Sequence, residues 1–312
     1  MTFHRGALHV TVPATSANLG PGYDCFGLAL SLHDEVTVQV ADAGLDVVVE
    51  GEGAGKVRTD DRNLVVKTMY TTFDRLGVRP AGLVVRCANR IPHGRGLGSS
   101  AAAIVAGIAA ARGLVVGAEQ RMDSQQMLEL ASELEGHPDN VAATILGGFT
   151  ISWSNGSEVG AVSIAPHPDI VPIAFVPDVE LRTATARGVI PDNIAHVDAA
   201  ANTARAALFV HAISSEPAQL MTATQDWLHQ RYRRSVMVDS LELVDQLRAA
   251  GVPAVVSGAG PTVLALVAGV SSHKPDKDKS EKGVKELVGE PRPGWRVLAL
   301  APEASGVQVK LS

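Results

Sequence analysis

The sequence predicts an α+β protein, and three observations support this prediction. Segments of strand character alternate with segments of helix character, but without a regular β-α-β period. The 312 residues suffice for one large domain or two packed domains with a sizeable core. Apolar residues make up 46% and charged residues 19% of the chain, as in an ordinary globular protein.

The first forty residues are predicted to be β-structure, and two further strands follow before residue 90. Alternation of apolar and polar residues, or a short run of β-branched residues between turn signals, marks each predicted strand. These strands cover Leu8–Val12, the alternating positions Val36, Val38 and Val40, Val47–Glu50, and Leu83–Cys87. A glycine-rich segment separates the first two.

Helices in the first half are predicted from their termini. Asn63 is placed to cap a helix over Leu64–Leu76, which Gly77 ends. A second helix, Ala101–Arg112, consists almost entirely of small residues, so we expect it to pack tightly. A third begins at Asp123 or Ser124 and ends at Gly136; its apolar face is formed by Met127, Leu128, Ala131 and Leu134.

A second unit is predicted from about Gly156, which divides the chain into residues 1–155 and 156–312. Its predicted elements are a strand at Ile170–Phe175, helices at Asn193–Ala212 and Ser240–Ala250, and strands at Val252–Val256 and Val263–Val267. The last two strands flank the glycine-rich turn Ser257–Thr262. The charged segment 272–283 is predicted to be a surface loop.

Composition argues against several kinds of function. The net charge is −6 and aromatics are only 4%, so we expect no nucleic-acid groove. Cys25 and Cys87 lie far apart and form no C-x-x-C pair, which predicts reduced thiols. The longest apolar run, Ala101–Ala111, is shorter than the ~20 residues that span a bilayer. With no signal-peptide pattern at the N-terminus, we expect no membrane contact and a cytoplasmic location.

Residues 92–102 read P-H-G-R-G-L-G-S-S-A-A and suggest a phosphate-binding loop. Alternate glycines let the backbone approach a ligand closely, and the free N–H groups of the following helix attract a polyphosphate. Ser99 or Ser100 could cap that helix or reach a phosphate-bound metal. The loop fits neither the P-loop nor the dinucleotide pattern. Taken alone, it is equally compatible with a flexible connector capped by serine.

Two further groups of polar residues are candidates for binding. Asn18 and Asp24 lie in a glycine-rich segment, where Asp24 could bind an ammonium group; a locally stabilised turn is the commoner explanation. Glu129 and Glu133 lie one helical turn apart, ahead of His137. Mg²⁺ often takes only one or two carboxylates and keeps several waters, so one of these acids is a candidate metal ligand.

Four segments, or blocks, of the sequence, taken in their order along the chain, resemble the motifs of one protein family. They are V-P-A-T-S-A-N-L-G-P-G-Y-D at 12–24, P-x-x-x-G-L-G-S-S-A-A at 92–102, E-G-H-P-D-N-V-A-A-T-I-L-G-G-F at 135–149 and S-G-A-G-P-T at 257–262. Together they resemble the GHMP kinases, the family that includes galactokinase and mevalonate kinase. The first and third blocks are most similar to the branch that phosphorylates L-homoserine.

The resemblance implies a fold and a reaction. The fold would be the GHMP kinase fold, with an N-terminal ribosomal S5 domain 2-like domain and a C-terminal ferredoxin-like α+β domain. The active site would lie in the cleft between them, where ATP and Mg²⁺ phosphorylate L-homoserine. Family precedent also favours a homodimer.

It also implies which residues bind ATP and magnesium. The ATP loop would comprise Pro92, His93, Gly94, Arg95, Gly96, Leu97, Gly98, Ser99, Ser100, Ala101 and Ala102. The resemblance places the metal on one Glu upstream of His137 together with a loop serine. We expect Glu133 with Ser100, with Ser99 and Glu129 as the alternatives.

Substrate and catalytic residues follow from the same resemblance. The substrate contacts would be Asn18, Asp24, His137, Asn140, Thr183, Arg187 and Arg233, and the catalytic residues Asn140, His137 and Arg187. Arg233 lies in L-H-Q-R-Y-R, where Arg231 replaces the family's proline and Arg234 follows, so which arginine faces inward is left open. Asn140 is an amide where mevalonate kinase has an Asp, and an amide takes no proton. We therefore hypothesise that the hydroxyl proton leaves through the γ-phosphate or water.

Three alternatives stay open at this point. A different GHMP enzyme would act on a substrate without an ammonium group, and Asp24 would then have no partner. A non-catalytic member would only bind a ligand, which predicts a degraded loop or a missing metal carboxylate. A protein without chemistry would leave the four blocks unexplained.

Overall fold

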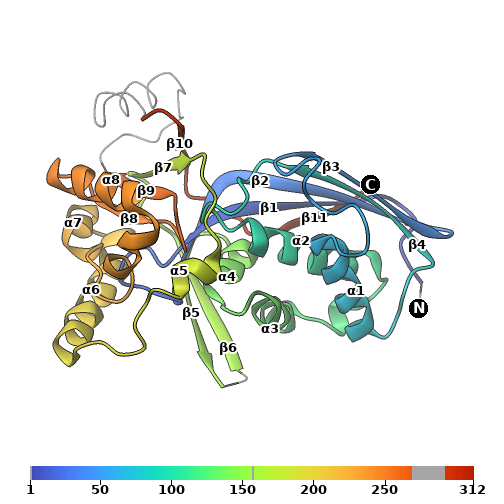
Figure 1. The fold of residues 1–312 in the computed structure, drawn as a ribbon. Coiled ribbons are helices and arrows are strands. Elements are labelled where there is room, and N and C mark those ends of the chain that lie inside the picture. The colour runs from blue at the N-terminus through green and yellow to red at the C-terminus, as the bar shows by residue number, and fades with distance from the viewer. Residues whose placement is uncertain (1, 157, 269–291) are drawn as a thin grey trace.

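The computed structural model describes residues 2–156, 158–268 and 292–312, so the charged segment 272–283 lies outside the described residues. The chain forms two lobes that meet along one side (Figure 1). Each lobe combines an antiparallel or mixed sheet with helices. The predicted α+β class is confirmed.

The first lobe contains a seven-stranded sheet. Its central order is β11-β1-β2-β4-β3, and β5 and β6 extend from β2. The strands are β1 (Leu8–Ala17), β2 (Phe26–Ala41), β3 (Gly44–Gly51), β4 (Gly82–Asn89), β5 (Phe149–Asn155), β6 (Glu158–Ile164) and β11 (Gln308–Leu311). Strand β1 pairs with both β2 and β11, so the last strand of the chain returns to the first lobe.

Four helices and a short 3₁₀ turn accompany this sheet. They are α1 (Leu64–Leu76), α2 (Ser99–Leu114), the 3₁₀ turn Ala118–Gln120, α3 (Ser124–Glu135) and α4 (Asp139–Leu146). Helix α1 has the predicted bounds, because the Asn63 side chain accepts from the N–H groups of Val65 and Val66 and Gly77 adopts a left-handed conformation. Helix α3 begins at the cap Asp123 and ends at Gly136.

The second lobe contains a four-stranded antiparallel sheet in the order β10-β7-β9-β8. The strands are β7 (Ile170–Pro177), β8 (Ala254–Val256), β9 (Val263–Ala268) and β10 (Trp295–Ala299). The helices are α5 (Thr183–Arg187), α6 (His196–Ser214), α7 (Leu220–Ala223) and α8 (Val238–Ala249), with 3₁₀ turns at Pro217–Gln219 and Arg231–Val236.

Aromatic packing fixes the two lobes against each other. Phe209 of α6 lies 5.4 Å from Phe26 and 5.5 Å from Phe149, measured between ring centroids, and all three rings are buried. The main hydrophobic core therefore runs from the first lobe into the second. A site between the lobes gains a rigid frame from this contact.

Pairing between β5 and β6 places the domain boundary differently from the prediction. The predicted division between residues 155 and 156 falls inside the β5–β6 hairpin, because Asn155 pairs with Glu158. The change of lobe comes after Ile164, where β6 ends. Short alternating strands at a hairpin look like an interdomain link when only composition is considered.

Candidate active site

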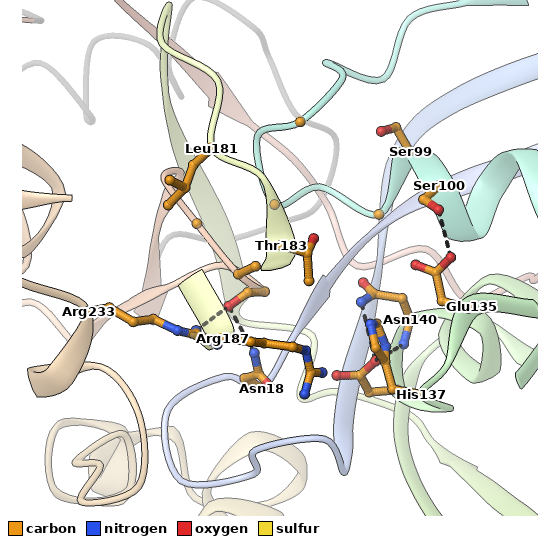
Figure 2. A pocket seen from close by; sticks show the side chains of 17 residues that line it. Asn18, Ser99, Ser100, Glu135, His137, Asn140, Leu181, Thr183, Arg187 and Arg233 are labelled. Carbon is orange, nitrogen blue, oxygen red and sulfur yellow. Dashed lines mark hydrogen bonds and ion pairs between the residues drawn. The ribbon is translucent and has the colours of Figure 1, made fainter. Parts of the chain in front are cut away.

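A cavity of about 120 Å³ lies between the lobes. Its lining residues come from both lobes (Figure 2): Asn18, Gly94, Gly96, Gly98, Ser99, Ser100, Glu135, His137, Asp139, Asn140, Leu181, Thr183, Arg187, Arg233, Gly258, Ala259 and Gly260. The structure thus brings the phosphate loop and most of the predicted substrate contacts together. No helix within the described ranges is long and apolar enough to cross a membrane.

The phosphate loop links β4 to α2 and depends on glycine backbone conformations. Gly94, Gly96 and Gly98 all have positive φ, at 63°, 74° and 72°. A Cβ on Gly98 would lie 2.0 Å from Thr15 Oγ1, so glycine is required there for two reasons. The Thr15 N–H in turn donates to the carbonyl of Leu97 at 3.1 Å, which holds the loop against β1.

The start of α2 offers backbone donors to the cavity. The Ala102 N–H donates to the Gly98 carbonyl at 2.9 Å, so the three N–H groups before it have no intrahelical acceptor. Gly98 is the N-cap and no side chain of the described residues caps the helix, so Ser99 and Ser100 do not act as the cap. Uncapped N–H groups at the positive end of a 16-residue helix form an anion site.

Not every residue of the predicted ATP loop faces the cavity. The Arg95 guanidinium donates to the carbonyls of His93, Pro177 and Asp178 at 2.7 to 2.9 Å, so it anchors the loop to the end of β7. The side chains of Leu97, Ala101 and Ala102 are fully buried in the core. Pro92 and His93 do not line the cavity either. These residues shape the loop, and its glycines and serines face the ligand space.

Glu135, and not the expected Glu133, lies beside Ser100 at the cavity. The Ser100 hydroxyl donates to Glu135 Oε2 at 2.6 Å, and both residues line the cavity. Burial raises the pKa of the Glu135 carboxyl, although the Ser100 hydrogen bond and the nearby His137 act to lower it. A hydroxyl beside a carboxylate is an oxygen donor set that suits Mg²⁺.

Glu133 and Glu129 lie outside this cavity. Glu133 pairs with Arg75 at 2.7 Å and its side chain is 61% exposed. Glu129 accepts from the Gln125 side chain at 3.0 Å. Residues 133 and 135 are separated by about 200° around a helix, so only one of them can face α2. Across the described ranges, no group of three or more His, Cys, Asp or Glu side chains could hold a metal.

The buried Asp139 and Asn140 and the partly buried His137 form a polar cluster at the start of α4. His137 Nδ1 lies 2.7 Å from Asp139 Oδ1, and Asn140 Oδ1 accepts from the Thr15 hydroxyl at 2.8 Å. Burial acts to lower the pKa of His137, but the hydrogen bond and charge of Asp139 outweigh it, so this pKa is raised. These hydrogen bonds hold the side chains of His137 and Asn140 at the cavity wall.

Asp24 and Arg187 bind each other across the lobes. Arg187 of α5 donates to both Asp24 carboxylate oxygens, at 2.5 and 3.0 Å, and to the Tyr23 hydroxyl at 2.8 Å. The two side chains are 35% and 34% exposed. Arg187 lines the cavity, whereas Asp24 does not. The two predicted anchors of a zwitterion therefore form an ion pair with each other.

The Asn18 side chain hydrogen-bonds to its own loop and to the Ser257–Thr262 turn. Its Nδ2 donates to the Gly258 carbonyl at 2.8 Å and its Oδ1 accepts from the Asp24 N–H at 3.0 Å. Both Asn18 and Asp24 have positive φ, at 67° and 55°. Asn18 lines the cavity but acts first as the link between this loop and the Ser257–Thr262 turn. Thr183, at the start of α5, lines the cavity as predicted.

Arg233 is the arginine of its cluster that faces inward. Its side chain is 1% exposed, yet no carboxylate lies within ion-pair distance of it in the described part of the chain. Arg231 pairs with Asp198 and Arg234 pairs with Asp245, both on the surface. A buried guanidinium without an anionic partner is costly, which indicates that a ligand anion completes this site.

Several site residues were missed from sequence alone. Glu135 and Asp139 belong to the third sequence block, but helical spacing was needed to separate Glu135 from Glu133. Tyr23 stands beside Asp24 in the first block, and its ring lies within 6 Å of both Arg187 and Arg233. Thr15 gave no distinct signal, because its role depends on the contact between β1 and the phosphate loop.

Fold and site together define a small-molecule kinase with a glycine-rich phosphate loop between two lobes. The GHMP kinases N terminal domain model matches residues 63–148, and the GHMP kinases C terminal model matches residues 209–290. The chain belongs to the GHMP kinase family.

Its relatives narrow this assignment to one branch. The chain is 52% identical over 307 residues to a homoserine kinase of Streptomyces avermitilis, covering 98% of this chain and 97% of the other. It is 51% identical to a homoserine kinase of Streptomyces coelicolor, covering 96% and 97%. A crystal structure of homoserine kinase from Cytophaga hutchinsonii matches with a TM-score of 0.83 and 25% identity, covering 99% of each chain. Within the family, the chain groups with the homoserine kinases.

Proposed function

We propose that this protein is an ATP-dependent kinase that converts L-homoserine to O-phospho-L-homoserine, a step toward threonine. The observation that carries this proposal is Arg233, a buried guanidinium beside the phosphate loop that has no anionic partner among the residues that the structure describes. Such a group calls for an anion in the ligand, which the carboxylate of an amino acid would supply. The identity of about 50% to homoserine kinases supports the choice of amino acid.

The amino acid would bind between the two lobes. Its carboxylate would bind Arg233 and Arg187, since a planar guanidinium suits a carboxylate. Its ammonium group would bind Asp24, which must then exchange its present partner Arg187. The Tyr23 ring, between the two guanidinium groups, would form one wall of this subsite.

ATP would place its phosphates on the glycine loop and the free N–H groups of α2. Ser100 and Glu135 would hold Mg²⁺, which neutralises phosphate charge when bound. The carboxylate and hydroxyl already lie 2.6 Å apart and need only separate to admit the ion. This assignment replaces the expected Glu133.

Transfer of the phosphoryl group would depend on the positions and charges of the residues around it rather than on a strong base. Asn140 would hold the substrate hydroxyl toward the γ-phosphate, and its own orientation is fixed by the Thr15 hydroxyl. Asp139 fixes His137, whose raised pKa increases its cationic fraction at neutral pH and so favours contact with phosphate. The hydroxyl proton would leave through the γ-phosphate or water, as a loose transition state allows.

The direct test is an ADP-release assay with L-homoserine, L-threonine, L-serine, mevalonate and galactose. We expect turnover with L-homoserine to exceed that with the others. Activity on mevalonate and none on L-homoserine would refute the substrate assignment.

A pair of variants tests the observation that carries the proposal. Arg233→Met should raise KM for L-homoserine by about 10-fold to 150-fold, the worth of a lost charged hydrogen bond, without a similar change for ATP. Arg231→Met is the matched control, because Arg231 lies in the same 3₁₀ turn but pairs with Asp198 on the surface. Equal effects of both variants would contradict the assignment of Arg233.

The rival within the family is an enzyme whose substrate has no ammonium group. Asp24→Ala separates the two possibilities. If an ammonium group binds Asp24, KM for L-homoserine rises by about 10-fold or more. If the substrate has none, the same variant frees Arg187 from its ion pair and leaves KM almost unchanged.

The location and the oligomeric state of the protein are two further proposals. We propose a cytoplasmic location, which fits the absence of a membrane-crossing helix in the described residues. We also propose a homodimer, which light scattering of the purified protein would test. A monomer mass at working concentration would overturn it.

A further inference from the structure

His229 is a fully buried histidine in the segment between α7 and the 3₁₀ turn at 231–236. Its Nε2 lies 2.8 Å from the Gly20 carbonyl, and its Nδ1 lies 3.0 Å from Arg233 Nη1. A carbonyl only accepts and a guanidinium only donates. The imidazole must therefore carry its hydrogen on Nε2 and a lone pair on Nδ1, which defines one neutral tautomer.

We propose that His229 is a positioning residue, whose neutral imidazole aims Arg233 at the carboxylate of the substrate. This inference rests on the proposed function, because it assumes that Arg233 binds a carboxylate.

Three acceptors fix the plane of the Arg233 guanidinium. Its Nε donates to the Ala186 carbonyl at 3.2 Å, and its Nη1 donates to His229 Nδ1 and to the Gly258 carbonyl at 2.9 Å. Arg233 Nη2 has no hydrogen-bond partner in the described part of the chain, while the residue lines the cavity. Nη2 is therefore the edge available to a ligand, and His229 sets its direction.

The same histidine links the substrate loop of the first lobe to the second lobe. Through Gly20 it contacts the loop that carries Asp24, and through Arg233 it contacts the carboxylate subsite. The Tyr23 ring lies 5.2 Å from its imidazole. The binding of both the ammonium group and the carboxylate of a zwitterion would thus depend on His229, although His229 touches neither group.

Burial, reinforced by Arg233, explains why His229 stays neutral. Asp226 Oδ1 lies 3.7 Å from Nε2, but this carboxylate also accepts from the N–H groups of residues 228 to 230. Arg233 faces the opposite ring nitrogen, and Asp24 and Tyr23 lie on the loop packed against the ring. Burial lowers the pKa of His229, with Asp226 opposing and Arg233 reinforcing the effect. A proton added to Nδ1 would place two donors face to face and release Arg233.

Two isosteres separate the two hydrogen bonds of His229. His229→Asn places an amide oxygen near the position of Nδ1 and so keeps an acceptor for Arg233, but it cannot reach Gly20. His229→Gln places an amide N–H near the position of Nε2 and keeps the bond to Gly20, but it removes the acceptor for Arg233. The two variants thus serve as controls for each other's packing defects.

We expect His229→Gln to raise KM for L-homoserine by about 10-fold to 100-fold, and His229→Asn to raise it by several-fold less. KM for ATP should stay near the wild-type value in both. Lowering the pH should raise KM for L-homoserine in the wild type, and His229→Asn should remove the part of this rise that comes from His229. Equal effects of the two variants, or a parallel change in KM for ATP, would overturn the proposal.

A spectroscopic measurement keeps this test separate from the test of the proposed function. Long-range ¹H–¹⁵N correlation spectra of the imidazole, assigned through His229→Asn, need no substrate. We expect a neutral ring with its hydrogen on Nε2 at neutral pH. An imidazolium or an Nδ1–H tautomer would overturn the positioning role, whereas this tautomer together with no L-homoserine turnover would overturn the proposed function alone.

Discussion

The sharpest test of the site compares Glu135 with Glu133, two acids on the same helix turn. Glu135→Gln keeps the size of the side chain and a partner for the Ser100 hydroxyl but removes the negative charge. Glu133→Gln removes an equal charge from the opposite face of α3, where it pairs with Arg75. A difference in kcat between the two variants therefore depends on where the lost charge lies, because both variants lose the same charge.

The expected magnitudes differ by orders of magnitude. Loss of one electrostatic partner of the transferring phosphoryl group costs about 3–4 kcal/mol, so Glu135→Gln should lower kcat by about 100-fold to 1000-fold. Glu133→Gln breaks an exposed ion pair worth about 0–1 kcal/mol, so it should leave kcat unchanged and lower stability only slightly. Burial already disfavours the Glu135 charge, so Glu135→Gln should not lower the melting temperature.

The assay measures ADP release over a range of Mg²⁺ concentrations at saturating ATP and amino acid. We expect Glu135→Gln to raise the Mg²⁺ concentration at half-maximal rate as well as to lower kcat. If Glu133→Gln lowered kcat and Glu135→Gln did not, the assignment of Glu135 would be wrong. Glu133, the residue expected from the sequence, would then be the metal ligand.

Four other predictions follow from the geometry. Gly98→Ala should abolish activity and destabilise the fold by at least about 1–2 kcal/mol, measured by urea unfolding, because of its positive φ and the Thr15 contact. Asn140→Asp should not strongly raise turnover near neutral pH; a strong rise would show that a base was missing. Asn63→Ala should cost about 1 kcal/mol in thermal unfolding without changing kcat, because it removes only the cap of α1. Below neutral pH the Mg²⁺ requirement should rise as the Glu135 carboxyl, whose pKa is raised, takes up its proton; a flat requirement down to pH ~4 would contradict this.

Helix ends and the phosphate loop could be predicted from the sequence because their signals are local. Asn63 and Gly77 bound α1, and Gly136 ends α3, because caps and left-handed glycines act within one turn. The glycine spacing at 94, 96 and 98 indicated a phosphate-binding loop ahead of α2, and the other three sequence blocks were needed to favour it over a capped connector.

Contacts between distant segments could not be predicted in the same way. The pairing of β11 with β1, and the Asp24–Arg187 ion pair, join residues more than 160 positions apart. Glu135 lay within a recognised block, but choosing it over Glu133 required the orientation of α3 relative to α2. Arg233 could be separated from its neighbours only by burial, since Arg231 and Arg234 have the same chemistry.

The charges of the site residues explain why a zwitterion suits the site. Asp24 and Arg187 neutralise each other, while Arg233 has no carboxylate partner among the described residues. A zwitterion can part the first pair and supply a new partner to each member, so no charge is stranded. A plain carboxylate bound to Arg233 alone would leave the Asp24–Arg187 pair intact, but one that also drew Arg187 away would leave Asp24 without its cation, at a cost of about 1–3 kcal/mol for an unsatisfied group. That cost corresponds to a preference of roughly 5-fold to 150-fold, so the ion pair itself would select for an ammonium group.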